Sequence, residues 1–324
     1  MSVTKWKVVF MGTPLFAIPV LEKLIENEDV IAVYTQPDRP SGRGQKMTPP
    51  PVKTVAQKHH IPCFQPPHFK KASTIEELKS LHPDLIVIIA YGLFLPKSVL
   101  DIPPHQTLNV HPSLLPQYRG AAPIQWALIN GDAQTGVTIL YVTPEMDAGD
   151  ILMQKKVKIS DEDTADSLQS KLCILGADLL IETLGGLKHH TITPRPQNPP
   201  KNSKEISLSP KLSKEISEID WTKPARTLFN LIRGANPWPG TYTYLQGELL
   251  KIHSAKVVSE NFQGKAGKIH SMTEGGLVIE TPQGLLLLTE VQKPNKRKMN
   301  ASEFLKGQRI KPGSYLGTQK NVSS

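Results

Sequence analysis

Strand-like apolar runs alternate with amphipathic helical patterns over the first part of the chain. The runs lie at 7–11, 30–34 and 85–90, and apolar residues recur at helical spacing over 16–25 and 75–81. Uninterrupted apolar strands separated by helices are typical of a parallel sheet that is covered on both faces. The pattern therefore predicts an α/β fold with a Rossmann-like, doubly wound and mostly parallel sheet, in which ligands bind at the carboxyl ends of the strands.

The pattern changes beyond about residue 190. A stretch rich in proline and asparagine is followed by one helical pattern at 225–232 and then by several short apolar runs between glycine turns. This succession predicts a linker and a smaller, OB-like β-barrel. The expected organisation is a first domain at 1–190, a linker at 191–208, the barrel at 209–312 and a frayed tail at 313–324.

Several classes of protein are excluded by composition and motif spacing. The two cysteines, Cys63 and Cys173, form no CxxC pair, which excludes a disulfide scaffold or a zinc cluster. The turn at Gly12 lacks the other glycines of a dinucleotide fingerprint, and the glycines of 41–46 lack P-loop spacing. No apolar run approaches the roughly 20 residues that a membrane span requires. We therefore expect a cytoplasmic protein without a metal site or a membrane anchor, and nothing in the pattern calls for more than a monomer.

Charge is distributed unevenly between the two predicted domains. Residues 1–200 contain 19 basic and 19 acidic residues, whereas 201–324 contain the other 19 of the 38 basic residues and 10 of the 29 acidic ones. The whole formal charge of +9 thus lies in the last part of the chain. Such asymmetry indicates a polyanionic partner, and the alternative is a surface kept soluble by lysine. The densest basic group, a candidate for phosphate contacts, consists of Lys293, Lys296, Arg297 and Lys298.

A second basic feature lies in the loop at 36–58. Beyond Asp38 this loop contains no acidic residue and five basic ones, which are Arg39, Arg43, Lys46, Lys53 and Lys58. Its proline and glycine content predicts irregular structure up to about Val52. The loop leaves the sheet at the ligand edge, and long loops in compact domains are commonly functional. We expect it to contact a polyanion, the alternative being a merely solvated loop.

Three polar side chains are predicted to meet at strand ends. In the strand at 107–111, Asn109 and His111 point to the same side because side chains alternate along a strand, and a following proline ends it. Asp147 lies in a glycine-containing loop after the strand at 137–142. We expect the three side chains to reach one site.

This set contains no nucleophile. Neither cysteine lies near it in sequence, Ser113 is not placed for attack, and no GxSxG motif is present. The set suits acyl transfer in which the substrates supply both nucleophile and electrophile. The Asn109 amide and His111 would then stabilise an oxyanion, and Asp147 would orient the histidine. The alternative is structural, with His111 capping a loop and Asn109 satisfying backbone groups, and residue spacing alone leaves both open.

A longer motif resembles a known family. The stretch from Asn109 to Pro123, NVHPSLLPQYRGAAP, together with Thr138 and MDAGD at 146–150, is similar to the tetrahydrofolate-dependent formyltransferases over about the first 190 residues. The resemblance implies 10-formyltetrahydrofolate as the formyl-donating cosubstrate. It also implies catalytic roles for Asn109, His111 and Asp147. The family's folate-contacting stretch falls on Ser113, Leu114, Leu115 and Pro116.

Three further motifs resemble the family members that act on a charged initiator tRNA. They are TQPDRPSGRGQK at 35–46, PPPVKTVA at 49–56 and NPWPG at 236–240. The resemblance implies formylation of the α-amino group of methionine on initiator Met-tRNA, which gives N-formylmethionyl-tRNA for translation initiation. In this reading a protonated His111 is paired with Asp147, and the barrel binds RNA. The implied contacts with the acceptor end of the tRNA come from Arg39, Arg43 and Lys46.

Two other hypotheses compete with this one. The first keeps the chemistry and changes the acceptor to a small amine, such as glycinamide ribonucleotide or an amino sugar, but gives no reason for the basic loop and the basic barrel. The second is a folate-binding hydrolase or a regulatory RNA-binding protein, against which the complete Asn, His and Asp set argues. Formyl transfer from 10-formyltetrahydrofolate to Met-tRNA or to small amines distinguishes them.

Overall fold

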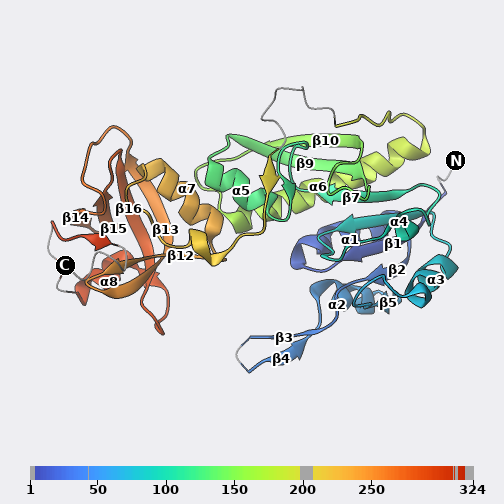
Figure 1. Ribbon diagram of the computed structural model, residues 1–324, viewed down its shortest axis with the longest axis horizontal. Helices are drawn as coiled ribbons and strands as arrows, with labels where there is room; N and C mark the ends of the chain where they lie inside the picture. Colours follow the sequence, from blue (N-terminus) through green and yellow to red (C-terminus); the bar gives the residue numbers. More distant parts are fainter. Residues whose placement is uncertain (1–3, 43, 198–206, 309, 311–312, 318–324) are drawn as a thin grey trace. The chain divides into compact units, whose positions relative to one another are not determined.

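Two compact units make up the chain, each assembled from separate stretches (Figure 1). The computed structural model describes residues 4–42, 44–197, 207–308, 310 and 313–317. The first unit, called the α/β unit, comprises Met1–Gly120, Thr135–Val157 and Gln169–Ser209. The second, called the β unit, comprises Ala121–Gln134, Lys158–Leu168 and Pro210–Ser324.

A seven-stranded sheet runs through the α/β unit in the order β10-β9-β7-β6-β1-β2-β5. Its strands are β1 (Lys7–Gly12), β2 (Asp29–Tyr34), β5 (Cys63–Phe64), β6 (Leu85–Ile89), β7 (Thr107–His111), β9 (Gln134–Tyr141) and β10 (Ile151–Lys158). From β5 to β7 all neighbours pair in parallel, and β7 pairs with β9 antiparallel. The mostly parallel, Rossmann-like sheet predicted from the apolar runs is confirmed.

Helices cover both faces of this sheet. They are α1 (Ile18–Asn27), which follows the short η1 (Leu15–Ala17), then α2 (Pro51–Lys58), α3 (Ala72–Ser80), α4 (Lys97–Leu100) and α6 (Ala165–Lys188). Met11 of β1 packs in one cluster with Leu78 of α3. On the opposite face, the α6 backbone at Gly176 lies so close to Val110 of β7 that a Cβ would stand 2.9 Å from it. No helix in the described part of the chain is both long and apolar enough to cross a membrane.

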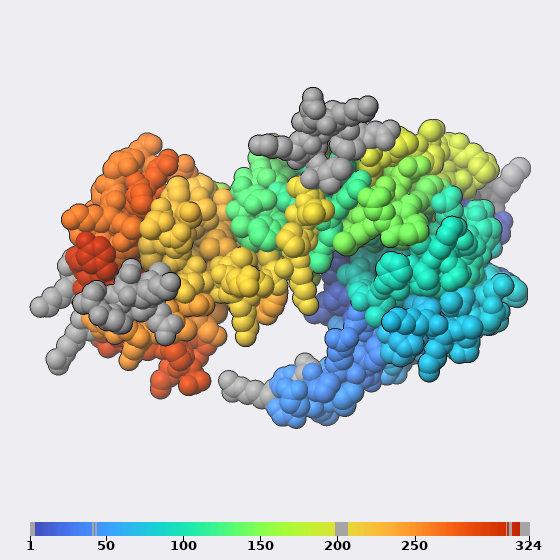
Figure 2. All heavy atoms as spheres, viewed as in Figure 1, coloured from blue at the N-terminus to red at the C-terminus, as the bar shows by residue number. Residues whose placement is uncertain are grey.

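The segments on either side of residue 43 pair as a short hairpin, whereas the composition of this region predicts an irregular loop. The strands β3 (Arg39–Ser41) and β4 (Lys46–Thr48) pair antiparallel. The glycines that argued against regular structure supply the turn instead, since Gly42 and Gly44 have φ angles of 69° and 99° that glycine adopts at little cost. Figure 2 shows the hairpin projecting from the body of the α/β unit.

A curled antiparallel sheet forms the core of the β unit, in the order β14-β15-β16-β13-β12-β18 with β17 beside β16. Its strands are β12 (Thr241–Leu245), β13 (Glu248–Ser259), β14 (Ile269–Thr273), β15 (Gly276–Glu280), β16 (Leu285–Gln292), β17 (Met299–Asn300) and β18 (Leu316–Gly317). Backbone hydrogen bonds from Ile269 N to Ser314 O (2.7 Å) and from Leu316 N to Gly267 O (2.8 Å) join its two ends. The smaller β domain predicted from the short apolar runs is confirmed.

Part of the predicted tail belongs to this sheet. Residues 313–317 were expected to fray, but Leu316 pairs with Leu245 of β12, and its side chain is buried in the core. The pairing partner lies far earlier in the chain, so the local sequence does not reveal it. Residues 318–324 of the predicted tail lie outside the described residues.

Helices of the β unit pack against one another as well as against its sheet. They are α5 (Pro123–Asn130), α7 (Ala225–Ala235) and α8 (Ala301–Lys306), with a short η2 (Lys214–Ile216) before α7. A Cβ on Gly234 of α7 would stand 2.7 Å from the Ile129 side chain of α5. Helix α5 therefore belongs structurally to the β unit, although it lies within the first half of the sequence.

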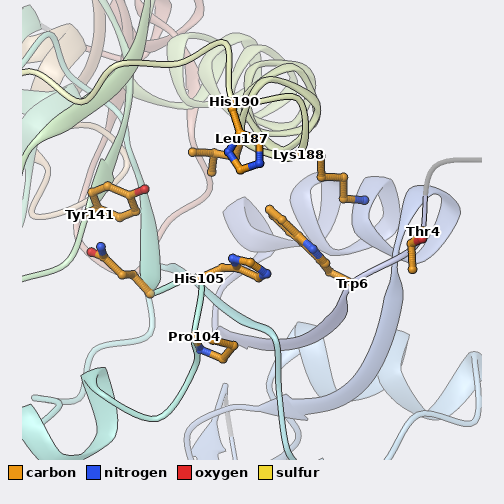
Figure 3. A pocket seen from close by; sticks show the side chains of 9 residues that line it. Thr4, Trp6, Pro104, His105, Tyr141, Leu187, Lys188 and His190 are labelled. Atoms are coloured by element: carbon orange, nitrogen blue, oxygen red, sulfur yellow. The ribbon is translucent and has the colours of Figure 1, made fainter.

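A buried ion pair ties the end of α6 to the start of β2. The Glu28 carboxylate accepts hydrogen bonds from the Lys188 ammonium and from the backbone N–H of Trp6 (2.7 Å). Both charged side chains are about nine-tenths buried or more. The Trp6 ring lies 5.1 Å from the ammonium and stacks on His105, with ring centroids 4.4 Å apart (Figure 3). Trp6, His105 and Lys188 line a pocket of about 430 Å³ at the amino ends of β1 and β7.

Lys188→Met should lower the free energy of unfolding of the α/β unit by about 3–5 kcal/mol, because it leaves the Glu28 charge buried without its cation. Adding Glu28→Gln should recover most of that loss. Urea denaturation followed by circular dichroism measures both variants. Equal losses for the single and the double variant would contradict the role of the ion pair.

Candidate active site

Asn109 and His111 lie at the carboxyl end of β7, at the sheet edge opposite the Trp6 pocket. The strand ends at His111, as the following proline predicted. Both side chains approach the carboxylate of Asp147, which lies in the loop between β9 and β10. The structure therefore brings together the three residues that the sequence predicted to share a site.

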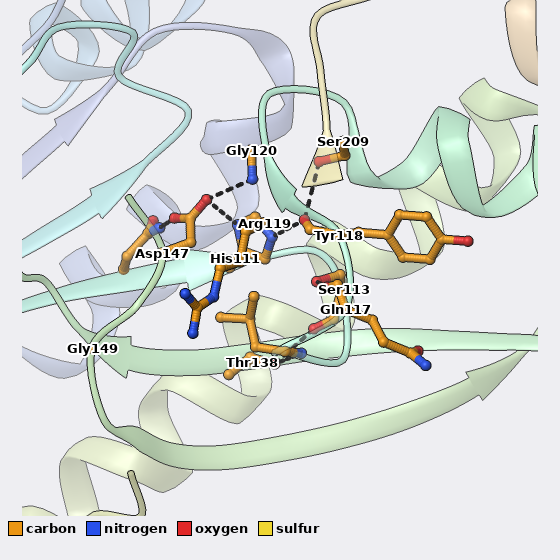
Figure 4. Close-up of polar contacts among 12 residues, drawn as sticks. His111, Ser113, Gln117, Tyr118, Arg119, Gly120, Thr138, Asp147, Gly149 and Ser209 are labelled. Atoms are coloured by element: carbon orange, nitrogen blue, oxygen red, sulfur yellow. Dashed lines mark hydrogen bonds and ion pairs between the residues drawn. The ribbon is translucent and has the colours of Figure 1, made fainter. Parts of the chain in front are cut away.

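The Asp147 carboxylate is contacted on both oxygens (Figure 4). Its Oδ1 accepts a hydrogen bond from Asn109 Nδ2 (3.2 Å), and its Oδ2 accepts the backbone N–H of Gly120 (2.9 Å). The same Oδ2 lies 3.6 Å from His111 Nδ1. Asp147 is 13% exposed in its side chain, and its backbone has a φ of 51° that non-glycine residues rarely adopt.

One hydrogen bond fixes the orientation of the His111 ring. Nε2 lies 3.0 Å from the backbone oxygen of Tyr118, which only accepts, so Nε2 carries a hydrogen. Nδ1 is therefore the nitrogen that faces the Asp147 carboxylate.

The segment that carries Tyr118 and Gly120 is held by residues at the end of the predicted linker and directly after it. The short strand β8 (Arg119–Gly120) pairs in parallel with β11 (Leu208–Ser209). Ser209 Oγ donates to the same Tyr118 oxygen that accepts from His111 (3.0 Å). At Gly120 the φ is 126°, and a Cβ would stand 2.7 Å from the Ser209 oxygen, so only glycine fits. Sequence reasoning missed this support because Ser209 lies 91 positions from Tyr118.

Thr138 of β9 fixes the stretch 113–116 that resembles a folate-contacting segment. Its Oγ1 donates to Ser113 O (2.6 Å) and accepts from Leu115 N (3.1 Å) and from Gln154 Nε2 (2.9 Å). The Ser113 hydroxyl donates to a neighbouring backbone oxygen, and the Leu115 side chain is buried. A ligand can therefore reach mainly the side chains that remain partly exposed, which are Leu114 and Pro116.

Comparison with known proteins identifies the family. The family model described as formyl transferase matches residues 6–184, and the model of the formyl transferase C-terminal domain matches residues 211–309. The chain is 42% identical to the methionyl-tRNA formyltransferase of Alkaliphilus oremlandii, over 96% of this chain and 99% of that protein. It is 45% identical to the methionyl-tRNA formyltransferase of Syntrophus aciditrophicus, over 97% of this chain and 99% of that protein. The chain belongs to the formyltransferase family.

The fold is shared with a solved sugar formyl transferase. The sugar 3N-formyl transferase WlaRD superposes with a TM-score of 0.65 at 17% identity, over 92% of this chain and 100% of that chain. At this level of identity the likeness concerns the fold alone. Among the described residues of this formyltransferase, no group of three or more His, Cys, Asp or Glu side chains is arranged to hold a metal ion.

The basic hairpin presents some of its predicted residues to solvent. Arg39 and Lys46 are exposed, whereas Arg43 lies outside the described residues. Lys53 is paired with Asp38 (2.9 Å), so its charge is already compensated within the formyltransferase chain. Hydrogen bonds from Gln65 and then from Lys53 hold the pKa of the Asp38 carboxyl below its usual range.

The basic group near the end of the β unit is partly neutralised. Lys293 pairs with Glu248 (2.8 Å), and Lys298 pairs with Glu290 (3.0 Å). Lys296 and Arg297 are exposed, and no carboxylate partner is found for them in the part of the chain that the structure describes. Of the four predicted phosphate contacts in this family member, Lys296 and Arg297 are thus more accessible to an anion than Lys293 and Lys298.

Thr138→Val should lower the free energy of unfolding by about 2–4 kcal/mol, because it leaves a buried carbonyl and a buried N–H without their partner. Thr183→Val is the matched control. Thr183 is also buried, but its hydroxyl makes a single hydrogen bond, to Leu179 O within α6. Thermal unfolding compares the two variants, and an equal loss of stability in both would refute the central position of Thr138.

Proposed function

We propose that this chain transfers the formyl group of 10-formyltetrahydrofolate to the α-amino group of methionine on initiator Met-tRNA, which gives N-formylmethionyl-tRNA for translation initiation. The observation that carries the proposal is the 42% to 45% identity with methionyl-tRNA formyltransferases over nearly the whole chain. The cluster of Asn109, His111 and Asp147 supports it. A monomeric state and a cytoplasmic location are part of the same proposal.

Two N–H groups at the cluster remain for the oxygen of a formyl group. Asn109 Nδ2 uses one hydrogen on Asp147 and keeps the other. In the proposed mechanism His111 also carries a hydrogen on Nδ1, and this N–H remains for the formyl oxygen because 3.6 Å is too long for a hydrogen bond to Asp147. Both groups donate to the formyl oxygen as it becomes negative, which lowers the barrier to attack at the formyl carbon.

The remaining chemistry comes from the substrates and from one carboxylate. The methionine nitrogen forms the new C–N bond, the bond between the formyl carbon and N10 of the folate then breaks, and one proton moves from the amine to N10. Asp147 stabilises the positive charge of His111 and orients a water that relays this proton. The amine is the nucleophile, which agrees with a cluster that contains no Ser or Cys nucleophile.

The substrates occupy different parts of the chain in this proposal. Residues 1–190 form the catalytic domain, and the folate lies against the stretch from Ser113 to Pro116, chiefly on Leu114 and Pro116. The acceptor end of the tRNA contacts the hairpin through Arg39, Arg43 and Lys46. Residues 209–312, reached through the linker at 191–208, bind the RNA backbone, and the surplus of basic residues there supports this assignment.

The assay that tests the function offers 10-formyltetrahydrofolate with either initiator Met-tRNA or a small amine and follows the formyl group. Formylation of Met-tRNA is expected. Transfer to an amino sugar or to glycinamide ribonucleotide instead would reject the proposed acceptor. Release of formate without transfer would indicate a hydrolase.

Asn109→Ala and His111→Ala should each lower kcat by about 100- to 1,000-fold, because each removes one donor to the developing oxyanion. The affinity for Met-tRNA should remain within about twofold, since neither side chain belongs to the basic hairpin or to the basic group of the β unit. Steady-state kinetics and filter binding measure the two quantities. A parallel loss of tRNA binding would contradict the assigned roles.

Arg39→Ala and Lys46→Ala should each reduce the slope of log affinity for Met-tRNA against log salt by about one unit, because each removes one phosphate contact. Lys79→Ala in α3 is the matched control, since Lys79 is an exposed lysine outside the hairpin. Binding measured at several salt concentrations gives the slopes. Equal slopes for the hairpin variants and the control would argue against tRNA contact by the hairpin.

A further inference from the structure

Gln197 forms hydrogen bonds with the backbone of the loop that carries Asp147. Its Nε2 donates to the backbone oxygens of Asp147 (2.8 Å) and Gly149 (2.7 Å). The approach is fixed by a pair of backbone hydrogen bonds between Arg195 and Ile151, at the start of β10, where the same loop ends. Gln197 thus reaches the loop from a segment that follows α6 and that no sequence motif connects with the active site.

The orientation of the Gln197 amide is unambiguous. Its Oε1 accepts from Arg119 Nε (3.1 Å) and Nη2 (2.8 Å). A guanidinium only donates and a backbone carbonyl only accepts, so the amide oxygen must face Arg119 and the amide nitrogen must face the loop. All the contacts are satisfied in one orientation, and a rotated amide would lose all four.

This arrangement supports both ends of the hydrogen bond that holds Asp147. Arg119 is adjacent to Gly120, whose N–H donates to the Asp147 carboxylate. On the other side, Gln197 restrains the Asp147 backbone in its left-handed conformation, with a φ of 51°. At Gly149 the loop lies so close to β9 that a Cβ would overlap the Tyr141 oxygen, so the loop has little freedom to shift there.

We propose that Gln197 is a positioning residue for Asp147, with Arg119 fixing the amide that does so. The proposal rests on the proposed function only in assigning Asp147 a catalytic role. Gln197 touches no substrate, and it acts by keeping the Asp147 carboxylate within reach of Asn109 and His111.

Gln197→Met tests the proposal because it retains the volume of the side chain and removes both its donor and its acceptor. We expect kcat for Met-tRNA formylation to fall by about 10- to 100-fold, as small misplacements of catalytic groups do. The KM values for Met-tRNA and 10-formyltetrahydrofolate should stay within about twofold. Gln197→Glu, which keeps the acceptor for Arg119 but loses the donor to the loop, should show the same loss.

A double-mutant cycle separates positioning from general stability. In an Asp147→Asn background, Gln197→Met should cause no further fall in kcat, because it acts through the group already changed. Thr241→Val, in the β unit, removes another buried side-chain donor to a backbone carbonyl (2.8 Å to Ile252 O). That control should lower the melting temperature and leave kcat within twofold. Multiplicative losses in the cycle would overturn the proposal.

A spectroscopic measurement tests the same inference without the reaction. In protein with labelled histidine, Gln197→Met should shift the ring resonances of His111, and Thr241→Val should leave them unchanged. Unchanged His111 resonances in Gln197→Met would overturn the positioning role even if the wild type formylated no tRNA. Conversely, if Gln197→Met shifts the His111 resonances but the wild type is inactive on Met-tRNA, only the proposed acceptor is rejected.

Discussion

The carboxylate of Asp147 is the contact on which the candidate active site depends. It binds Asn109 on β7 and the backbone N–H of Gly120, and it lies beside His111. A carboxylate has several acceptor positions, so one side chain can hold three chain segments together. The cost is a rarely populated backbone at Asp147, of the order of 1–3 kcal/mol, which the surrounding hydrogen bonds offset.

The sequence predicted the elements whose signals are local. The apolar runs of β1, β2 and β6 were recognised because a buried parallel strand is apolar along its whole length. The shared face of Asn109 and His111 followed from the alternation of side chains in one strand. Gln197 and Ser209 could not be found in this way, because their partners lie 48 to 91 positions away and their polar side chains look like those of any linker.

The composition also overstates how many basic side chains lack a carboxylate partner. Lys53, Lys293 and Lys298 each have a carboxylate partner, a pairing that no count of residues reveals. Net charge still describes the long-range attraction of a polyanion. The number of short-range contacts depends instead on cations such as Lys296 and Arg297, for which the described residues provide no carboxylate. The hairpin shows the same limit for structure, since its glycines predict an irregular loop and instead form a turn.

The interleaved course of the chain has a consequence for how members of this family could diverge. Helix α5 comes from the first half of the sequence yet packs against α7, with Gly234 beside Ile129. A recombination event at the predicted linker would therefore join a β unit to an α5 that had not evolved with it. The two units are thus expected to be inherited as a matched pair rather than exchanged as independent modules.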